Sequence, residues 1–159
     1  MGKFGAYKIL KDEKLIIEYH TGRITTLDFI ESRRIISSDE SYNPDFDLIF
    51  DWRDVEMIVT QDDINEFIIF FKKFSKIVGD RKSAYLTSKP NEVIVTTLFS
   101  QGIEDSSVKT GTFSTIKGVV NWINNKGLDK NKLMNIIKEL KTHPNILGIK
   151  AQLSPKKRQ

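Results

Sequence analysis

The hydrophobic pattern is most distinctive between Phe46 and Val78, where an uninterrupted apolar run leads into a strongly amphipathic stretch. The run at 47–52 is too short for a helix and does not alternate, which predicts a central strand covered on both faces. From Ile64 onward, apolar residues recur at three- and four-residue steps and predict a helix with one apolar stripe. Because four phenylalanines lie within eight residues here, we expect this helix to supply more of the core than any other element.

The start of this helix carries a capping signal. Thr60 stands three residues before Asp63. This spacing lets the hydroxyl accept one backbone N–H while the carboxylate accepts another, as in a capping box. Acidic residues in the first turn also interact favourably with the positive end of the helix dipole. We therefore interpret Thr60 first as an N-cap.

The N-terminal third predicts a hairpin and a helix. Two short strands are expected at 6–11 and 14–20, joined by a polar turn, and the second alternates in the manner of a half-buried strand. A helix should follow, capped by Thr25 or Thr26 and running to about Ser38. A polar loop then leads to the central strand.

The C-terminal half predicts two more strands and two more helices. The strands are expected at 82–88 and 108–113. Ser114 should cap a helix that ends at Gly127, and Asp129 should begin another, with an apolar face and a lysine-rich face.

Residues 90–104 allow two interpretations. The β-branched run at 93–97 favours a strand. Pro90, followed by apolar residues at helical spacing, favours a helix with proline in its first turn. The alternation of strands and helices elsewhere supports the helix.

The resulting order is β-β-α-β-α-β-α-β-α with one further helix, an α/β fold in which helices connect successive parallel strands. We expect a mixed sheet of about five strands flanked by helices. The chain divides into an α/β domain at 1–126, a helical extension at 127–153 and a disordered basic tail at 154–159.

The amino-acid composition excludes several kinds of function. The 159 residues contain no cysteine, which excludes disulfides, thiol catalysis and thiolate metal sites. No stretch approaches the roughly 20 apolar residues that span a bilayer. We therefore expect a cytoplasmic protein without a transmembrane segment.

Charge is distributed unevenly. Residues 126–159 hold nine Lys or Arg against two acidic residues, or +7, and the total is +4, so residues 1–125 carry −3. Phosphate contacts need basic side chains gathered on one face, so we do not expect the main domain to bind nucleic acid.

The element order, together with the sequence LIFDWRDVEMIVTQDDI at 48–64, resembles the SpoIIAA-like proteins of the STAS superfamily, particularly the bacterial STAS/SEC14-type branch. That branch often has a hydrophobic strand ending in an Asp-Leu-Arg-Asp-like stretch, which corresponds to 51–54 here. The segment 112–123 is similar to the family's last strand and its tryptophan-containing helix. The resemblance covers roughly residues 5–125 and implies a mixed sheet flanked by helices. It implies interaction or ligand binding more often than catalysis.

The resemblance also implies a possible phosphorylation site. In the anti-sigma-factor antagonists of this superfamily, the helix after this strand begins with Asp-Ser-Ser-Gly, whose first serine is phosphorylated. That motif falls at 59–62 here, and only the hydroxyl of Thr60 remains. Asp62 and Asp63 would repel a phosphate. Thr60 is thus an N-cap first and a candidate phosphoacceptor second.

The residues at the end of the central strand are the best candidates for function, because open α/β sheets gather ligands at the carboxyl ends of their strands. Arg53 could hold an anion and Trp52 could stack on a flat group. Alternatively, Arg53 pairs with a neighbouring aspartate and Trp52 closes the core. With two residues of the following turn, the candidate interaction or ligand site is Asp51, Trp52, Arg53, Asp54, Thr60 and Asp63.

Other chemistry is not indicated. His20 and His143 are the only imidazoles, and two isolated histidines make neither a metal site nor a catalytic triad. The acidic residues around the central strand lack calcium-loop spacing, and the glycines form no phosphate-binding motif. We expect no enzyme activity, no metal and no cofactor.

Two hypotheses of function follow. The first is a noncatalytic STAS-like domain that contacts another protein or a second copy of itself in bacterial regulation, through the turn at 54–63. The second is a carrier or sensor of a small apolar or lipid-like ligand. A carrier needs an apolar cavity of roughly several hundred cubic ångströms, bounded by the phenylalanine-rich helix and the segment 93–99, whereas an interaction domain should have a filled core.

Overall fold

A computed structural model describes residues 4–75 and 79–142 and shows one mixed five-stranded sheet flanked by helices. The elements along the chain are β1 (Phe4–Leu10), β2 (Leu15–Ile24), α1 (Thr26–Ser37), β3 (Asp47–Met57), α2 (Gln61–Ser75), β4 (Arg81–Leu86), α3 (Pro90–Gly102), β5 (Val108–Phe113), α4 (Ile116–Ile123) and α5 (Lys130–Thr142). The predicted order and the α/β class are confirmed.

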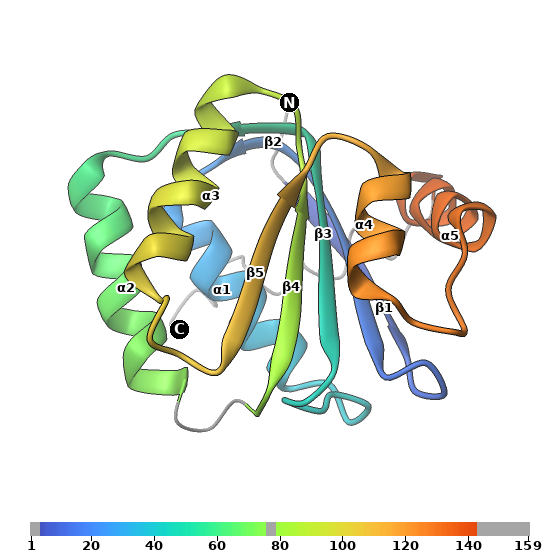
Figure 1. Ribbon diagram of the computed structural model, residues 1–159. Helices are drawn as coiled ribbons and strands as arrows, with labels where there is room; N and C mark the ends of the chain where they lie inside the picture. The colour runs from blue at the N-terminus through green and yellow to red at the C-terminus, as the bar shows by residue number, and fades with distance from the viewer. Residues whose placement is uncertain (1–3, 76–78, 143–159) are drawn as a thin grey trace, which may run out of the picture.

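The sheet has the sequential order β1-β2-β3-β4-β5. The hairpin strands β1 and β2 are antiparallel, and every later neighbouring pair is parallel. Helices α1, α2 and α3 connect the parallel strands and lie on one face of the sheet, and α4 and α5 lie on the other (Figure 1). Two separate apolar cores result, one on each face.

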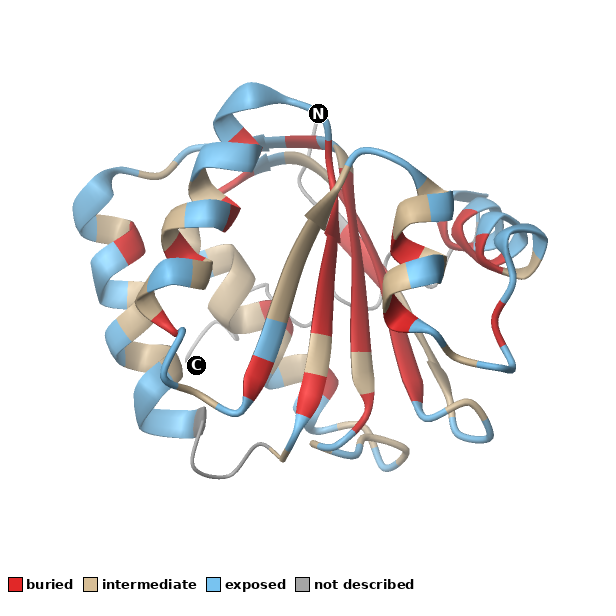
Figure 2. Ribbon diagram, in the orientation of Figure 1, coloured by how far each residue is buried: buried red, intermediate tan, exposed pale blue. Residues whose placement is uncertain are grey.

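The strands β2, β3 and β4 form the interior of the sheet and are largely buried (Figure 2). All residues from Leu15 to His20 are buried. The predicted hairpin is confirmed, but the prediction that its second strand is half-buried was wrong. The parallel neighbour β3 places β2 inside the sheet, and helices cover both of its faces, so its polar residues are buried along with its apolar ones.

The central strand is longer than predicted. It continues to Met57 because β2 also extends, to Ile24, and pairs with it. A bulge interrupts this pairing, since Tyr19 faces Asp51 while Thr21 faces Asp54. The turn predicted at 54–63 is accordingly reduced to a short connection between β3 and α2.

The helix α2 contributes less to the core than its sequence suggested. Ile64 is buried, but the phenylalanines are only partly buried, and Ile69 and Phe74 are 69% and 46% exposed. The helix packs beside α3 and α1, at the outside of the molecule (Figure 1). The strands β2 and β3 instead contribute more buried apolar residues than any other described element. The end of the predicted stripe, Val78, lies outside the described residues.

The segment with two interpretations is a helix. Pro90 occupies the first turn of α3, as the helical interpretation required. Other boundaries differ slightly from prediction: Thr115, not Ser114, caps α4. That helix ends before Gly127, because Asn124 takes a left-handed conformation (φ 54°).

The helix α5 belongs to the core on its face of the sheet. Its apolar face is buried against β1, β2 and α4 through Leu133, Ile136, Ile137 and Leu140. The predicted domain boundaries remain predictions, and both His143 and the tail at 154–159 lie outside the described residues. None of the described helices combines the length and apolarity needed to cross a bilayer.

Candidate functional site

A cavity of about 490 Å³ lies on the face of the sheet that carries α1, α2 and α3. Its floor is formed by the first halves of β3, β4 and β5, and its walls by α1 and α2. Aromatic and aliphatic side chains dominate the lining, among them Phe29, Ile30, Leu48, Phe50, Phe67, Phe70, Phe71, Phe74, Tyr85, Phe99 and Val108.

The position of α2 explains why this space is open. The helix packs mainly on α3 and α1, without comparable packing on the sheet. Its rings meet the rings of its neighbours: Phe67 lies 4.9 Å from Phe99 and 5.1 Å from Phe29 between ring centroids. Phe71 meets the same Phe99 edge-on at 5.4 Å. The phenylalanines of α2 thus lie over an open space between the helix and the sheet, and they do not fill it.

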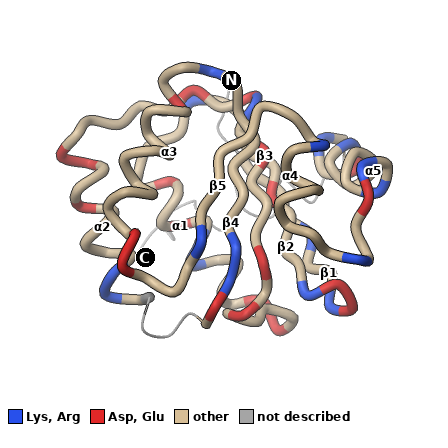
Figure 3. The backbone as a smooth tube through the Cα atoms, viewed as in Figure 1, with Lys and Arg blue, Asp and Glu red and all other residues tan. Residues whose placement is uncertain are grey.

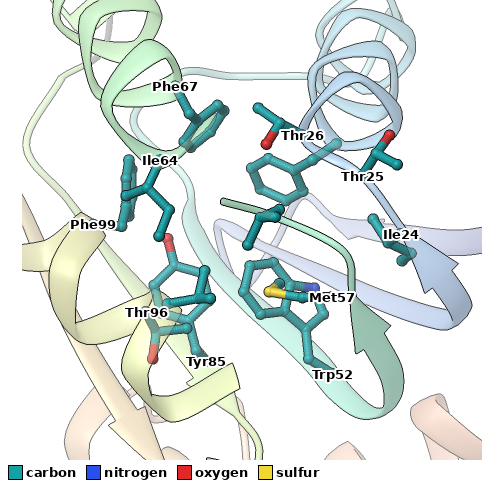
Figure 4. A pocket seen from close by; sticks show the side chains of 13 residues that line it. Ile24, Thr25, Thr26, Trp52, Met57, Ile64, Phe67, Tyr85, Thr96 and Phe99 are labelled. Carbon is teal, nitrogen blue, oxygen red and sulfur yellow. The ribbon is translucent and has the colours of Figure 1, made fainter. Parts of the chain in front are cut away.

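A second, smaller hollow of about 50 Å³ lies toward the carboxyl ends of the strands. Figure 4 shows Trp52 and Met57 from β3 facing Ile64 from α2 and Phe99 from α3. The two hollows share four lining residues, Phe29, Phe67, Tyr85 and Phe99. They therefore form the two ends of one apolar region that follows the strand direction.

Below the larger cavity, a buried ion pair joins β2 to α1. Arg33 donates to the carboxylate of Glu18, which is fully buried, and the ring of His20 lies 3.0 Å from the same carboxylate oxygen. The guanidinium also lies over the rings of Phe29 and Phe50, at 5.2 and 5.0 Å. Burial opposes ionisation of Glu18, but the charges of Arg33 and His20 outweigh it, and the pKa of this carboxyl is lowered.

Two further arginines line the cavity. Arg34 pairs with Glu31 on the same helix and is largely exposed. Arg81 begins β4 and is only 8% exposed. Its Nη1 donates to the hydroxyl of Tyr42 at 3.3 Å, and its buried Nε has no hydrogen-bond partner.

The residues that the sequence singled out on β3 lie on opposite faces of the sheet. Trp52 is buried in the aromatic cluster beside the smaller hollow, where its ring lies 4.9 Å from that of Tyr85. Arg53 instead donates two hydrogen bonds to the buried Asp51, from Nε at 2.9 Å and Nη2 at 2.7 Å. This geometry matches the alternative in which Arg53 pairs with a neighbouring aspartate and Trp52 closes the core.

Asp54 faces α5. Its carboxylate accepts the hydroxyl of Tyr19 at 2.8 Å and lies 3.2 Å from the ammonium of Lys141. Partial burial alone would raise the pKa of Asp54, but the hydrogen bond from Tyr19 and the charge of Lys141 lower it. Burial and the same hydrogen bond raise the pKa of Tyr19 to about 12. This contact attaches the last described helix to the central strand.

Thr60 and Asp63 form the predicted capping box at the start of α2. The backbone N–H and the hydroxyl of Thr60 both donate to Asp63, at 2.7 and 2.8 Å, and the backbone N–H of Asp63 donates to the Thr60 hydroxyl at 3.2 Å. These hydrogen bonds lower the pKa of Asp63. A phosphate on Thr60 would face this carboxylate directly.

In the part of the chain that the structure describes, no three His, Asp or Glu side chains are grouped closely enough to hold a metal ion. His20 is part of the buried pair with Glu18.

Sequence reasoning missed the charged residues in and directly below the cavity. Glu18, Arg33 and Arg81 come from three different elements, so no local spacing connects them. One signal was present: Glu18 stands directly after three apolar residues, Leu15 to Ile17, and a carboxylate buried there needs a partner.

Comparison with known proteins identifies the fold. No family model and no curated protein sequence matches the chain. A solved structure that does match is an uncharacterised protein of the DUF3478 family with a SpoIIAA-like fold, from Shewanella loihica PV-4. The TM-score is 0.51 at 11% identity, over 77% of this chain and 94% of that one. The likeness shows a SpoIIAA-like α/β fold, as the sequence resemblance implied.

Proposed function

We propose that this SpoIIAA-like domain is a noncatalytic binding protein that holds a small apolar or lipid-like ligand between α1 and α2. The single observation that carries the proposal is the cavity of about 490 Å³. Pockets for small molecules typically measure about 300–1,000 Å³ and are lined mostly by apolar and aromatic side chains. Both properties apply here.

The dense packing of protein interiors supports the same conclusion. Protein interiors are packed as densely as organic crystals, and voids larger than a water molecule are few. Apolar side chains that line a space large enough for water remain exposed to water, and covering apolar surface is favourable by about 25 cal/mol per Å². A ligand with an apolar body would cover the phenylalanines of α2 and the sheet residues Leu48 and Phe50.

The competing hypothesis, a protein contact through the turn at 54–63, has weaker support. Its polar side chains already satisfy one another: Thr60 pairs with Asp63, and Asp54 pairs with Tyr19 and Lys141. The core behind the turn is not filled, whereas an interaction domain should have a filled core.

Two substitutions on α1 test the proposal. Ile30 lines the cavity, whereas Leu27, one turn earlier on the same helix, is 66% exposed and lines neither hollow. We expect Ile30→Trp to weaken binding of the neutral fluorescent probe N-phenylnaphthylamine by about tenfold, equivalent to ~1.4 kcal/mol. Leu27→Trp should leave the affinity unchanged. Equal affinity in both variants, or no binding by the wild type, would overturn the proposal.

Native mass spectrometry provides an independent test. Protein purified from its host should retain additional mass that is released under denaturing conditions. Ile30→Trp, purified in parallel, should retain less of it. Consistent absence of such a ligand from the wild-type protein counts against a carrier function.

A further inference from the structure

We propose that the ligand carries an anionic head group, a carboxylate or a phosphate monoester, and that Arg81 binds it at the amino-terminal end of β4. The inference rests on the proposed function and specifies the class of ligand that the cavity accepts.

The environment of Arg81 favours the binding of an anion. The side chain lines the cavity and the residue is 8% exposed. Its Nε is buried without a partner, and Nη1 makes only one longer hydrogen bond, to Tyr42 at 3.3 Å. A guanidinium stays charged at any physiological pH, so it cannot escape burial by losing its proton. Burying such a charge without a partner is strongly unfavourable.

No protein carboxylate within the described residues forms an ion pair with Arg81. Asp47, on the neighbouring strand, instead accepts the backbone N–H of Lys82 at 2.7 Å and is not part of the cavity lining. The other two arginines of the cavity differ: Arg33 is paired with Glu18, and Arg34 with Glu31. Arg81 is the cavity-lining arginine whose charge remains uncompensated in this part of the chain.

The polarity of the cavity matches an elongated amphipathic molecule. Tyr42 and Ser83 line the cavity together with Arg81, which begins β4, where Figure 3 shows basic positions. The next residue, Lys82, instead faces the other side of the sheet, where it donates to the carbonyl of Trp122. The opposite end, around Trp52 and Ile64, is almost entirely apolar. A head group bound at Arg81 therefore directs its chain beneath the rings of α2 and toward the smaller hollow.

The chemistry of arginine explains the preferred head groups. The planar guanidinium presents parallel N–H donors that match the oxygens of a carboxylate or a phosphate. Its unpaired Nε is available for one of these hydrogen bonds. An alcohol with the same alkyl chain as the anionic ligand fills the apolar region equally well, but it brings no negative charge to Arg81.

Displacement of N-phenylnaphthylamine separates the contributions of head and chain. The competitors are dodecanoate, dodecyl phosphate and dodecanol, with acetate and inorganic phosphate as head groups without a chain. We expect the wild type to bind at least one of dodecanoate and dodecyl phosphate about tenfold more tightly than dodecanol, or more. Acetate and phosphate alone should not displace the probe.

Substitutions identify the residue responsible. Arg81→Met should remove the preference for the anions and leave the dodecanol affinity unchanged, which also shows that the cavity is intact. Arg23→Met is the control, because Arg23 lines neither hollow and pairs with Glu56 at the surface. It should keep the preference. If Arg81→Met does not fold, Arg81→Lys retains the charge and should still prefer the anions over dodecanol.

Failure of the head-group inference and failure of the proposed function give different results. If dodecanol binds as tightly as both anions, the anionic head group is wrong. If Arg81→Met retains the preference, the assignment of the head group to Arg81 is wrong. In both cases the apolar ligand stands. If acetate or phosphate displaces the probe as well as the chain anions do, an isolated anion site is present and the inference is also wrong. If no chain compound binds the wild type, the proposed function itself fails.

Discussion

The guanidinium of Arg33 lies 5.0 Å above the ring of Phe50 and pairs with the fully buried carboxylate of Glu18. This ion pair sits directly below the cavity and joins the first crossover helix to the central pair of strands. The positive charge of this cavity-lining arginine is therefore neutralised by a carboxylate of the protein itself.

Removing the buried carboxylate should be costly. We expect Glu18→Gln to lower the free energy of unfolding by about 3 kcal/mol, because the substitution leaves the partly buried charge of Arg33 without its partner. The matched control is Glu56→Gln, since Glu56 pairs with Arg23 at the surface, where both side chains are more than half exposed. That change should stay within about 0.5 kcal/mol. Urea denaturation measures both, and similar losses would contradict the account.

The same pair makes stability depend on pH. The pKa of Glu18 is lowered in the folded protein from the ordinary value of 4.5. Its contribution is therefore complete above the unfolded pKa and is lost as the pH falls through the lower, folded value. The difference in stability between wild type and Glu18→Gln should therefore shrink as the pH falls below the unfolded value of 4.5. A difference that is constant or grows on acidification would show that the carboxylate is not stabilised by Arg33 and His20.

Much of the fold could be predicted from sequence because the signals are local. The three- and four-residue spacing from Ile64 to Phe74 and the capping box at Thr60 depend only on residues that lie one or two turns apart. Pro90 resolved an ambiguous segment by the same kind of local rule.

The site could not be predicted in the same way. Apolar periodicity shows which face of α2 turns inward, but not how far the helix lies from the sheet. The sequence therefore left open whether this helix fills the core or bounds a cavity, and the structure shows the cavity. Likewise, the environment of Arg81 depends on Tyr42, which reaches it only through the tertiary fold.

The last described helix should behave as part of the core. Ile137 is 2% exposed and packs against the sheet, whereas Met134 on the same helix is 44% exposed. We expect Ile137→Ala to lower the free energy of unfolding by about 3 kcal/mol, through lost burial and the cavity left behind. Met134→Ala should cost less than about 1 kcal/mol. A thermal melt with a separate early transition would instead show an independently unfolding appendage.

The hydroxyl of Thr60 should act mainly as a helix cap. We expect Thr60→Ala to cost about 1 kcal/mol of stability, since one backbone N–H at the start of α2 loses its acceptor. Thr97→Ala removes a hydroxyl from inside α3, where alanine is the better helix former, and should be neutral or slightly stabilising. Probe affinity should be unchanged in both. A large loss of binding in Thr60→Ala would assign the residue a direct role in function.

The central claim is that the space beneath α2 holds an apolar ligand, and methyl NMR during titration with dodecanol tests it most directly. The account predicts shifts for methyl groups that line the two hollows, such as those of Ile30, Leu48 and Ile64, with no shift for Leu133 and Ile137 in the opposite core. Shifts confined to exposed residues such as Leu27, Ile69 and Ile94, or no shifts at all, would contradict it.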